Sequence, residues 1–201
     1  MPADYEKQSY WHDRFASETA FEWYTSSAAF LNALGPLLDK FPRDAGILHL
    51  GSGTSDLHNH LRERGFVNVT NIDYEPLALQ RGQQLERNRF GDVRTRYLVA
   101  DATQLDPKDT YQIAIDKGMA DAIACGGTEA VVATAESIRR CLDPDGVWVC
   151  LSYSASRFGL KAVQSLFDVQ VLSRVPTPKS KPTNPDIFHF CYLLRPRQGV
   201  A

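Results

Sequence analysis

The fold of this chain is decided by the stretch Ile47-Leu48-His49-Leu50-Gly51-Ser52-Gly53-Thr54-Ser55-Asp56-Leu57. A short apolar run leads directly into two glycines, and a helix-compatible stretch over 56–64 follows. This order is typical of a buried strand over 46–50, a tight turn and the start of a helix. Because Gly51 and Gly53 have no side chain, they allow a sharp bend and let a ligand approach the backbone closely.

A second predicted strand, Val67–Ile72, ends in Asp73, which lies 20 positions after Gly53. A carboxylate at that distance can accept both ribose hydroxyls of a nucleoside, as in nucleotide-binding βαβ units. The alternative is an ordinary turn between strand and helix, followed by an acid without a ligand. The combination of glycine turn and acid predicts a nucleoside-binding site.

The kind of nucleoside follows from the position where a dinucleotide-binding turn has its third glycine. That turn has the pattern Gly-x-Gly-x-x-Gly and places a pyrophosphate on the helix N-terminus. Here the sixth position is Asp56, whose carboxylate would lie near the pyrophosphate charge. The sequence therefore argues against NAD and favours a cationic ligand without phosphate, such as S-adenosylmethionine.

Length and composition favour a single cytoplasmic domain. The 201 residues, 43% of them hydrophobic, suffice for one α/β domain over 1–201, with a helical cap over 1–45 and a Rossmann-like core over 46–195. The net charge of −2 gives no overall nucleic-acid footprint. No apolar run approaches the length of a membrane span, and no signal segment is visible. The four scattered cysteines predict reduced thiols, and we expect no metal site.

The segment before the first strand is rich in aromatic residues: Tyr10-Trp11-His12-Asp13-Arg14-Phe15, followed by Phe21-Glu22-Trp23-Tyr24. Exposed aromatic rings gain nothing from water, so we expect this segment to pack on the sheet. Two roles are open, a helix that only covers the core and a lid whose rings attract a sulfonium cation. A helix over 26–41 follows, capped at Ser26 or Ser27 and kinked or divided at Pro36.

Strands and helices alternate through the rest of the chain. The further predicted strands are 95–100, 112–115, 147–151, 169–172 and 187–194, and the further helices are 76–89, 129–142 and 158–167. The order β-α-β-α-β-α-β-α-β-α-β-β predicts an α/β fold, a doubly wound, Rossmann-like seven-stranded sheet with helices on both faces. The last two strands are joined by a Pro-rich loop over 176–185 without a helix. We therefore expect one antiparallel C-terminal strand in a mostly parallel sheet.

Polar residues recur where the predicted strands end: Gly51 and Gly53, then Asp73, then Asp101, then Asp116 and Lys117. Each of them alone is an ordinary strand end. Open parallel sheets bind ligands beyond the carboxyl ends of their strands, so the recurrence predicts a site at that edge.

Several segments carry a family resemblance: 50–55, 68–74, the Asp101 turn, and Ile115-Asp116-Lys117-Gly118-Met119-Ala120-Asp121-Ala122. They resemble class I, seven-strand S-adenosylmethionine-dependent methyltransferases, most closely the group of the elongation-factor-1A lysine methyltransferases. That group opens with a Tyr-Trp-x-x-Arg-Tyr motif and an acid-Trp segment, which 10–15 and 22–24 resemble. It ends in a Phe-His-Phe strand, which 188–190 resembles, so the similarity covers nearly the whole chain.

The resemblance implies cofactor contacts from the N-terminal segment and the glycine turn. Trp11, Phe15 and Trp23 would line the cofactor site from the lid. Gly51 would contact the cofactor through its backbone, and Gly53 belongs to the same turn. Phe15 stands where the family usually has Tyr, so a hydroxyl contact is lost.

The resemblance also implies roles at the strand ends. Asp73 would hold the ribose, with Tyr74 against the adenine. Asp101 and Ala102 would meet the adenine edge, and Lys117 would lie near the methionine end.

Two further departures from the family are present, and the second bears on the substrate. Ser52 replaces a usual Cys, which is a mild change. The stretch 125–128 is short where relatives often carry a longer insertion on the substrate side, and this affects the expected protein substrate more than the cofactor.

No catalytic base stands out in the sequence. Asp116 is the candidate for shaping the acceptor end of the pocket, and its alternative role is to orient Lys117 by ion pairing. His189 is more simply a histidine within the sheet than a base.

We expect a methyltransferase that uses S-adenosylmethionine, releases S-adenosylhomocysteine, and methylates a protein lysine, with a translation elongation factor as the implied substrate. We expect no nucleic-acid or membrane partner. Three alternatives stay open: a small-molecule methyltransferase of the same fold, a non-catalytic scaffold that binds S-adenosylmethionine, and an NAD-type oxidoreductase.

Overall fold

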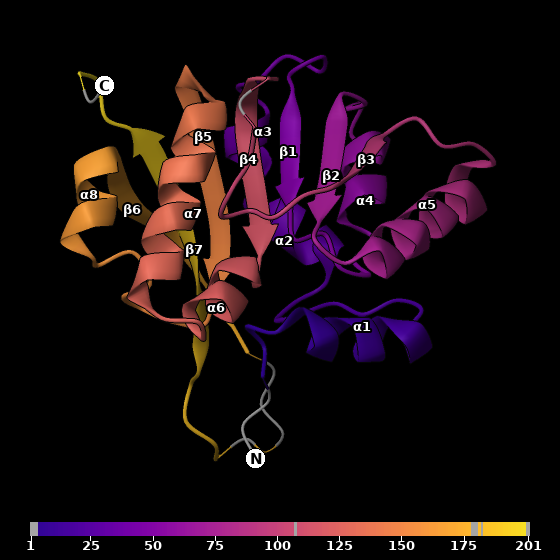
Figure 1. The fold of residues 1–201 in the computed structure, drawn as a ribbon, viewed down its shortest axis with the longest axis horizontal. Helices are drawn as coiled ribbons and strands as arrows, with labels where there is room; N and C mark the ends of the chain where they lie inside the picture. Colours follow the sequence, from indigo (N-terminus) through magenta and orange to yellow (C-terminus); the bar gives the residue numbers. More distant parts are fainter. Residues whose placement is uncertain (1–3, 107, 178–180, 182, 200–201) are drawn as a thin grey trace.

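The computed structural model describes residues 4–106, 108–177, 181 and 183–199. At its centre is a seven-stranded sheet of order β3-β2-β1-β4-β5-β7-β6 (Figure 1). The strands are β1 (Ile47–Leu50), β2 (Val69–Asp73), β3 (Arg96–Val99), β4 (Tyr111–Lys117), β5 (Leu142–Ser152), β6 (Phe167–Pro176) and β7 (Phe188–Pro196). β7 runs antiparallel to β5 and β6, and the other pairs are parallel. The predicted fold class is therefore confirmed.

Helices cover both faces of the sheet (Figure 1). They are α1 (Gln8–Ser17), α2 (Ser27–Ala33), α3 (Gly35–Leu38), α4 (Leu57–Glu63), α5 (Pro76–Phe90), α6 (Met119–Ala124), α7 (Thr128–Cys141) and α8 (Lys161–Leu166). Alternate residues of β1 enter opposite cores: Ile47 packs with α2, α3 and α4, whereas Leu48 and Leu50 pack with α6, α7 and α8. A parallel sheet buried on both faces needs such continuous apolar strands.

Local chemistry explains where the N-terminal helices begin and end. The Ser26 hydroxyl accepts a hydrogen bond from the backbone N–H of Ala29 at 3.2 Å and caps α2. The predicted helix is divided at Leu34, because Gly35 and Pro36 begin the separate helix α3. None of the helices in the described part of the chain is long and apolar enough to cross a membrane.

Three details of the predicted order are wrong. The alternation required a helix between β3 and β4, but residues 100–106 and 108–110 form turns and irregular structure instead. α6 was not predicted, because its few residues show no amphipathic period. The expected turn over 143–146 lies within β5, where pairing with β4 is interrupted between Leu142 and Val147.

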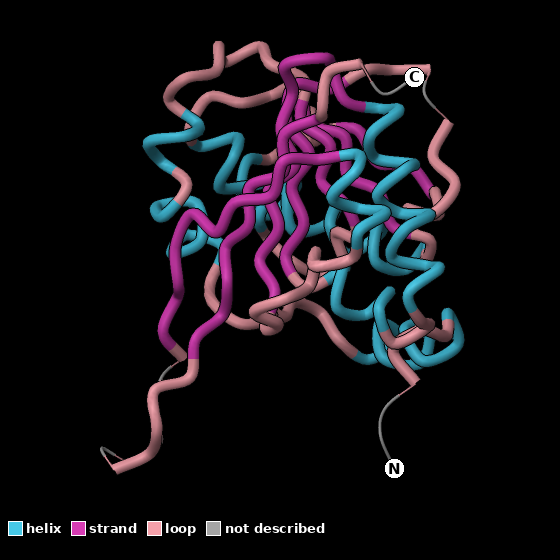
Figure 2. The backbone as a smooth tube through the Cα atoms, turned by 90° about the vertical axis from the view of Figure 1, so that its left-hand side faces the viewer, coloured by secondary structure: helices cyan, strands magenta, loops and turns pink. Residues whose placement is uncertain are grey.

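Three elements reach beyond the carboxyl ends of the central strands. α1 crosses this end of the sheet in Figure 1, and β6 and β7 extend past the other strands in Figure 2. β6 continues to Pro176, so the predicted loop over 176–185 begins later than expected, and 178–180 and 182 lie outside the described residues. The edge where β1, β2, β3 and β4 end is thus enclosed by the N-terminal segment.

Candidate functional site

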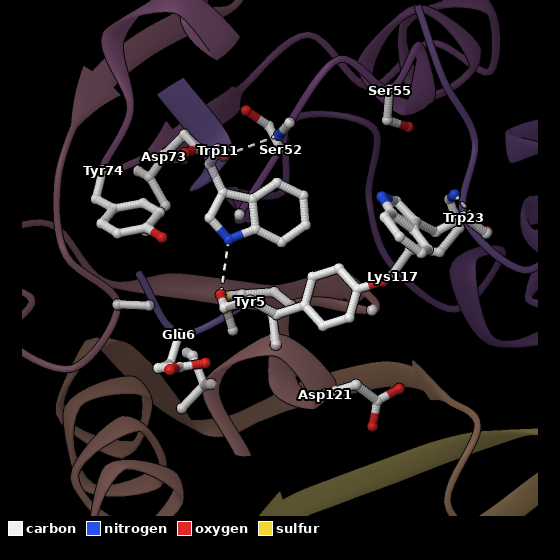
Figure 3. A pocket seen from close by; sticks show the side chains of 18 of the residues that line it. Tyr5, Glu6, Trp11, Trp23, Ser52, Ser55, Asp73, Tyr74, Lys117 and Asp121 are labelled. Atoms are coloured by element: carbon white, nitrogen blue, oxygen red, sulfur yellow. Dashed lines mark hydrogen bonds between the residues drawn. The ribbon is translucent and has the colours of Figure 1, made fainter. Parts of the chain in front are cut away.

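A cavity of about 360 Å³ lies where these four strands end, between the sheet and the N-terminal segment (Figure 3). Every residue predicted to bind the cofactor lines it: Trp11, Phe15, Trp23, Gly51, Gly53, Asp73, Tyr74, Asp101, Ala102 and Lys117. Residues from five separate parts of the sequence therefore meet in one cavity, and its volume is that of an ordinary small-molecule site.

The glycine turn after β1 needs its glycines for two reasons. Both have a positive φ, 54° at Gly51 and 50° at Gly53, which disfavours side chains. A Cβ added to Gly51 would also lie 2.6 Å from Cγ of Met119. The missing side chain at Gly51 therefore makes room for Met119 of α6, whereas we had expected it to make room for a ligand.

Asp73 ends β2 inside the cavity with both carboxylate oxygens held by backbone. Its Oδ2 accepts from the N–H of Gly53 at 2.9 Å, and its Oδ1 accepts from the N–H of Glu75 at 3.0 Å. Burial raises the pKa of Asp73 to about 6, against the hydrogen bonds from Glu75 and Gly53, which favour the ionised form. A carboxylate oxygen can accept more than one hydrogen bond, so both oxygens can still accept from a ligand.

The end of β3 forms the neighbouring wall. Oδ1 of Asp101 accepts from the backbone N–H and the hydroxyl of Thr103, both at 2.8 Å. Its Oδ2 has no partner among the described residues. Tyr74 and Ala102 complete this wall, which offers one free acceptor between an aromatic ring and a small apolar side chain.

The aromatic residues of α1 cover the cavity. Trp11 projects over it in Figure 3, and its indole N–H donates to the backbone oxygen of Tyr5 at 2.7 Å. The ring centroid of Trp11 lies 5.5 Å from that of Phe15 and 6.1 Å from that of Trp23. Phe15 is 3% exposed, so it packs against the glycine turn, while Trp11 and Trp23 are half-buried. The N-terminal segment therefore both covers the cavity and lines it.

Glu22 does not line the cavity itself but holds three residues beside it, a role that the sequence did not predict. Its Oε1 accepts from the Ser55 hydroxyl and from the backbone N–H of Asp56, both at 2.9 Å. Its Oε2 lies 2.6 Å from Nζ of Lys117. A carboxylate of the N-terminal segment thus occupies the start of α4, where a dinucleotide would place its pyrophosphate. The Asp56 carboxylate turns away to His60, at 3.4 Å.

Lys117 joins the end of β4 to the same segment. Its Nζ also donates to the backbone oxygen of Trp23 at 2.9 Å. Burial lowers the pKa of Lys117, and the negative charge of Glu22 opposes that shift. Burial alone would raise the pKa of Glu22, but Lys117 outweighs it and the pKa is lowered. The two groups form a buried ion pair in which each charge favours the ionised form of the other.

Asp116, the candidate catalytic residue, is not brought to the cavity. Its carboxylate is fully buried and accepts from the indole N–H of Trp148 at 2.8 Å, the thiol of Cys150 at 3.4 Å and the N–H of Ala120 at 3.2 Å. Its alternative role is also not seen, because Lys117 pairs with Glu22. Asp116 points to the opposite face of the sheet from Lys117, since neighbours on a strand alternate.

Asp121 of α6 also lines the cavity and was missed by sequence reasoning. Its Oδ2 accepts from the Tyr24 hydroxyl at 2.7 Å and from the N–H of Tyr153 at 3.0 Å. Its Oδ1 accepts from the Ser152 hydroxyl at 2.6 Å and pairs with Arg157 at 2.7 Å. Asp121 thus fixes the side walls of the cavity, and its oxygens are fully used.

Tyr24 is held in a strained conformation at this position. Its φ of 68° is the one positive value outside glycine among the described residues. Such strain persists only where the surroundings impose it, and it is common at functional sites. Three contacts hold Tyr24 in this conformation. Its hydroxyl is bonded to Asp121, its ring packs against Gly118, and its ring centroid lies 4.4 Å from that of His189. His189 does not itself line the cavity.

Comparison with known proteins agrees with this geometry. A family model described as a methyltransferase domain matches residues 47–146. The whole chain is 54% identical to "Methyltransferase srdJ" of Neurospora crassa and covers 87% of it. It is 28% identical, over 80% of its length, to the eEF1A lysine and N-terminal methyltransferase of Mus musculus, but it spans 23% of that protein.

A solved structure gives the same result for the fold. The N-methyltransferase NodS from Bradyrhizobium japonicum, in complex with S-adenosyl-L-homocysteine, matches with a TM-score of 0.64 at 13% identity. The match covers 93% of this chain and 99% of that chain. With its strand order, its glycine turn and its full-length relative, this chain belongs to the class I S-adenosylmethionine-dependent methyltransferases.

Proposed function

We propose that this enzyme transfers a methyl group from S-adenosylmethionine to a lysine side chain of a cytoplasmic protein. The observation that carries this acceptor is the charge of the cavity lining. The lining includes several aromatic rings and the Glu6 carboxylate, and Lys117, the one Lys or Arg among the described lining residues, is paired with Glu22. The described lining residues therefore present no unpaired Lys or Arg that would repel the ammonium group of an incoming lysine. The similarity to a protein named for eEF1A lysine methylation supports the same acceptor.

The cavity has the donors and acceptors that this cofactor requires. When bound, S-adenosylmethionine supplies an electrophilic methyl group on a positively charged sulfur. We propose that Asp73 accepts from its ribose hydroxyls and that Tyr74 and Asp101 meet its adenine. The rings of Trp11 and Trp23 would cover the sulfonium, exclude water and orient the acceptor.

The acceptor must reach the cofactor as a neutral amine. Asp121 is unsuited to take the proton, because its two oxygens already accept from Tyr24, Ser152, Tyr153 and Arg157. Glu6 lines the cavity from the exposed side. We propose that Glu6 attracts and orients the lysine ammonium, which then loses its proton to water.

The test is transfer of radiolabelled methyl groups from S-adenosylmethionine in cell extract, separated into protein and small-molecule fractions. We expect label in protein that yields methyl-lysine on hydrolysis, and less label with the Asp73→Ala variant at the same cofactor concentration. Label confined to small molecules would refute the lysine acceptor. No label in either fraction, from protein that binds S-adenosylhomocysteine, would favour the non-catalytic scaffold.

A small-molecule acceptor is the second candidate, and one feature favours it. Residues 125–127 alone join α6 to α7, so no long loop extends from this side of the cavity. A short connection gives a protein substrate less surface to bind. The radiolabel experiment separates the two candidates directly.

A further inference from the structure

His49 of β1 is a polar residue of the cavity that neither the family motifs nor the proposed function uses. It lines the cavity although it is 1% exposed. Its Nδ1 lies 2.9 Å from Oδ1 of Asn71, the residue opposite on β2. Its Nε2 has no hydrogen-bond partner among the described residues. This ring nitrogen of a buried side chain is thus left for a ligand in the cavity, since polar groups of buried side chains are normally paired.

The hydrogen bonds of Asn71 determine which ring nitrogen of His49 carries the proton. The amide nitrogen of Asn71 donates to the backbone oxygen of Arg96 at 3.2 Å and to Oγ1 of Thr95 at 3.0 Å. A carbonyl oxygen can only accept, so the amide nitrogen must face Arg96 and Oδ1 must face His49. His49 therefore carries its proton on Nδ1, and Nε2 has a free lone pair.

A buried carboxylate anchors this arrangement at its far end. The hydroxyl of Thr95 donates to Oε2 of Glu86 at 2.8 Å, and Glu86 also accepts from Arg62 at 2.8 Å. Burial alone would raise the pKa of Glu86, but its hydrogen bonds lower it, so it stays an ionised acceptor. Burial lowers the pKa of His49 to about 4, which keeps the ring neutral. The direction of every bond from Glu86 to His49 is thereby fixed.

We propose that Nε2 of His49 accepts a hydrogen bond from the α-ammonium group of S-adenosylmethionine, and that Asn71, Thr95 and Glu86 are positioning residues that hold this tautomer. The cofactor has three kinds of polar hydrogen. The ribose hydroxyls are matched by Asp73 and the adenine amino group by the β3 end, which leaves the α-ammonium.

The position of His49 supports the same pairing. It lies opposite Ile115 of β4, on the sheet face that Lys117 shares two residues further along that strand. It therefore lies on the β4 side of Asp73, toward the expected methionine end. The inference concerns the cofactor end of the cavity and is independent of which acceptor is methylated.

The test compares two ligands in the His49→Leu variant by isothermal titration calorimetry. S-adenosylhomocysteine carries the α-ammonium, whereas 5′-methylthioadenosine lacks the whole amino-acid end. We expect affinity for S-adenosylhomocysteine to fall by roughly 10- to 150-fold, as for a lost hydrogen bond to a charged group. Affinity for 5′-methylthioadenosine should change little. Equal changes for both ligands, or none for either, would overturn the proposal.

His58 of α4 offers a matched control. It is also fully buried, with a pKa that burial lowers to about 4 and an Nδ1 without a partner, but it does not line the cavity. His58→Leu should cost comparable stability and leave both affinities unchanged. Asn71→Leu should weaken S-adenosylhomocysteine selectively, and its effect should not add to that of His49→Leu.

Nitrogen spectra of the ¹⁵N-histidine-labelled native protein keep the proposal testable if the variants fail to fold. We expect His49 to show a protonated Nδ1, and its Nε2 resonance to move when S-adenosylhomocysteine saturates the protein but not with 5′-methylthioadenosine. A protonated Nε2, or a resonance unaffected by S-adenosylhomocysteine, would refute the assignment. Failure of the native protein to bind S-adenosylhomocysteine would instead refute the cofactor site as a whole.

Discussion

Replacement of Asp73 by alanine tests the ribose contact, on which the assignment of the cavity as the cofactor site depends. The change removes two carboxylate oxygens that we expect to accept from the ribose hydroxyls. Hydrogen bonds to a charged group contribute about 1.5–3 kcal/mol, so affinity for S-adenosylhomocysteine should fall by roughly 10- to 150-fold.

The same change also affects the folded protein. It leaves the N–H groups of Gly53 and Glu75 without their acceptor, at about 1–3 kcal/mol each where water cannot replace it. Removal of a buried carboxylate whose pKa is raised to about 6 offsets part of this loss. We therefore expect a folded but less stable variant, which thermal unfolding can verify before binding is measured.

The pH dependence of binding gives an independent measure. Because the pKa of Asp73 in the folded protein, about 6, lies above that of an unfolded chain, protonation of this group stabilises the empty protein at low pH. That stabilisation is lost as the pH rises through about 6. Ribose hydroxyls donate to the ionised carboxylate, so affinity should increase over the same interval. Asp73→Ala should abolish this increase.

Calorimetric titration with S-adenosylhomocysteine at several pH values measures both effects. Glu75→Gln is the matched control, because Glu75 is an adjacent buried acid that caps α5 and does not line the cavity. Its affinity should remain near that of the native protein. A folded Asp73→Ala protein with native affinity would refute the ribose contact.

Three further predictions concern the N-terminal segment and the turn. Hydrogen exchange in α1 should slow when S-adenosylhomocysteine binds, and Trp11→Ala should weaken that binding. Equal exchange with and without ligand, together with unchanged affinity in the variant, would show that α1 only packs on the core. Gly51→Val should unfold more easily and bind no cofactor, because its side chain would collide with Met119 at a positive φ; native stability in calorimetry would contradict this. Lys117→Met should lower the free energy of unfolding by about 3–5 kcal/mol, and adding Glu22→Gln should restore most of it; an unchanged denaturation midpoint in the single variant would exclude the buried pair.

Most of the fold could be predicted because it depends on short-range patterns. The apolar run before Gly51, the two glycines and the acid at Asp73 specify strand, turn and second strand within a few tens of residues. The elements that were missed lack such a pattern. α6 is short, and the chain between β3 and β4 turns without a helix, so neither has a period to detect.

Ten residues of the candidate site were predicted from the sequence, and two acidic residues beside them were missed. All ten predicted cofactor residues line one cavity. Seven of them lie at the carboxyl ends of parallel strands, which meet at one edge, and Trp11, Phe15 and Trp23 come from the N-terminal segment that covers this edge. Whether they bind the cofactor stays a prediction. Glu22 and Asp121 were missed, because their partners Lys117 and Tyr24 lie far away in the sequence, and only the path of the chain joins them.

The sequence by itself determined the class of fold, the position of the glycine turn and the edge of the sheet where the cavity lies. Tertiary structure alone decided which polar side chains face the cavity. Asp116 and Lys117 are neighbours on β4, yet Asp116 is buried in the core, where Trp148 donates to it, and Lys117 pairs with Glu22 on the opposite face. A strand buried on both faces has no alternation of apolar and polar residues, so the sequence of β4 does not show which of its two terminal charged residues faces which side.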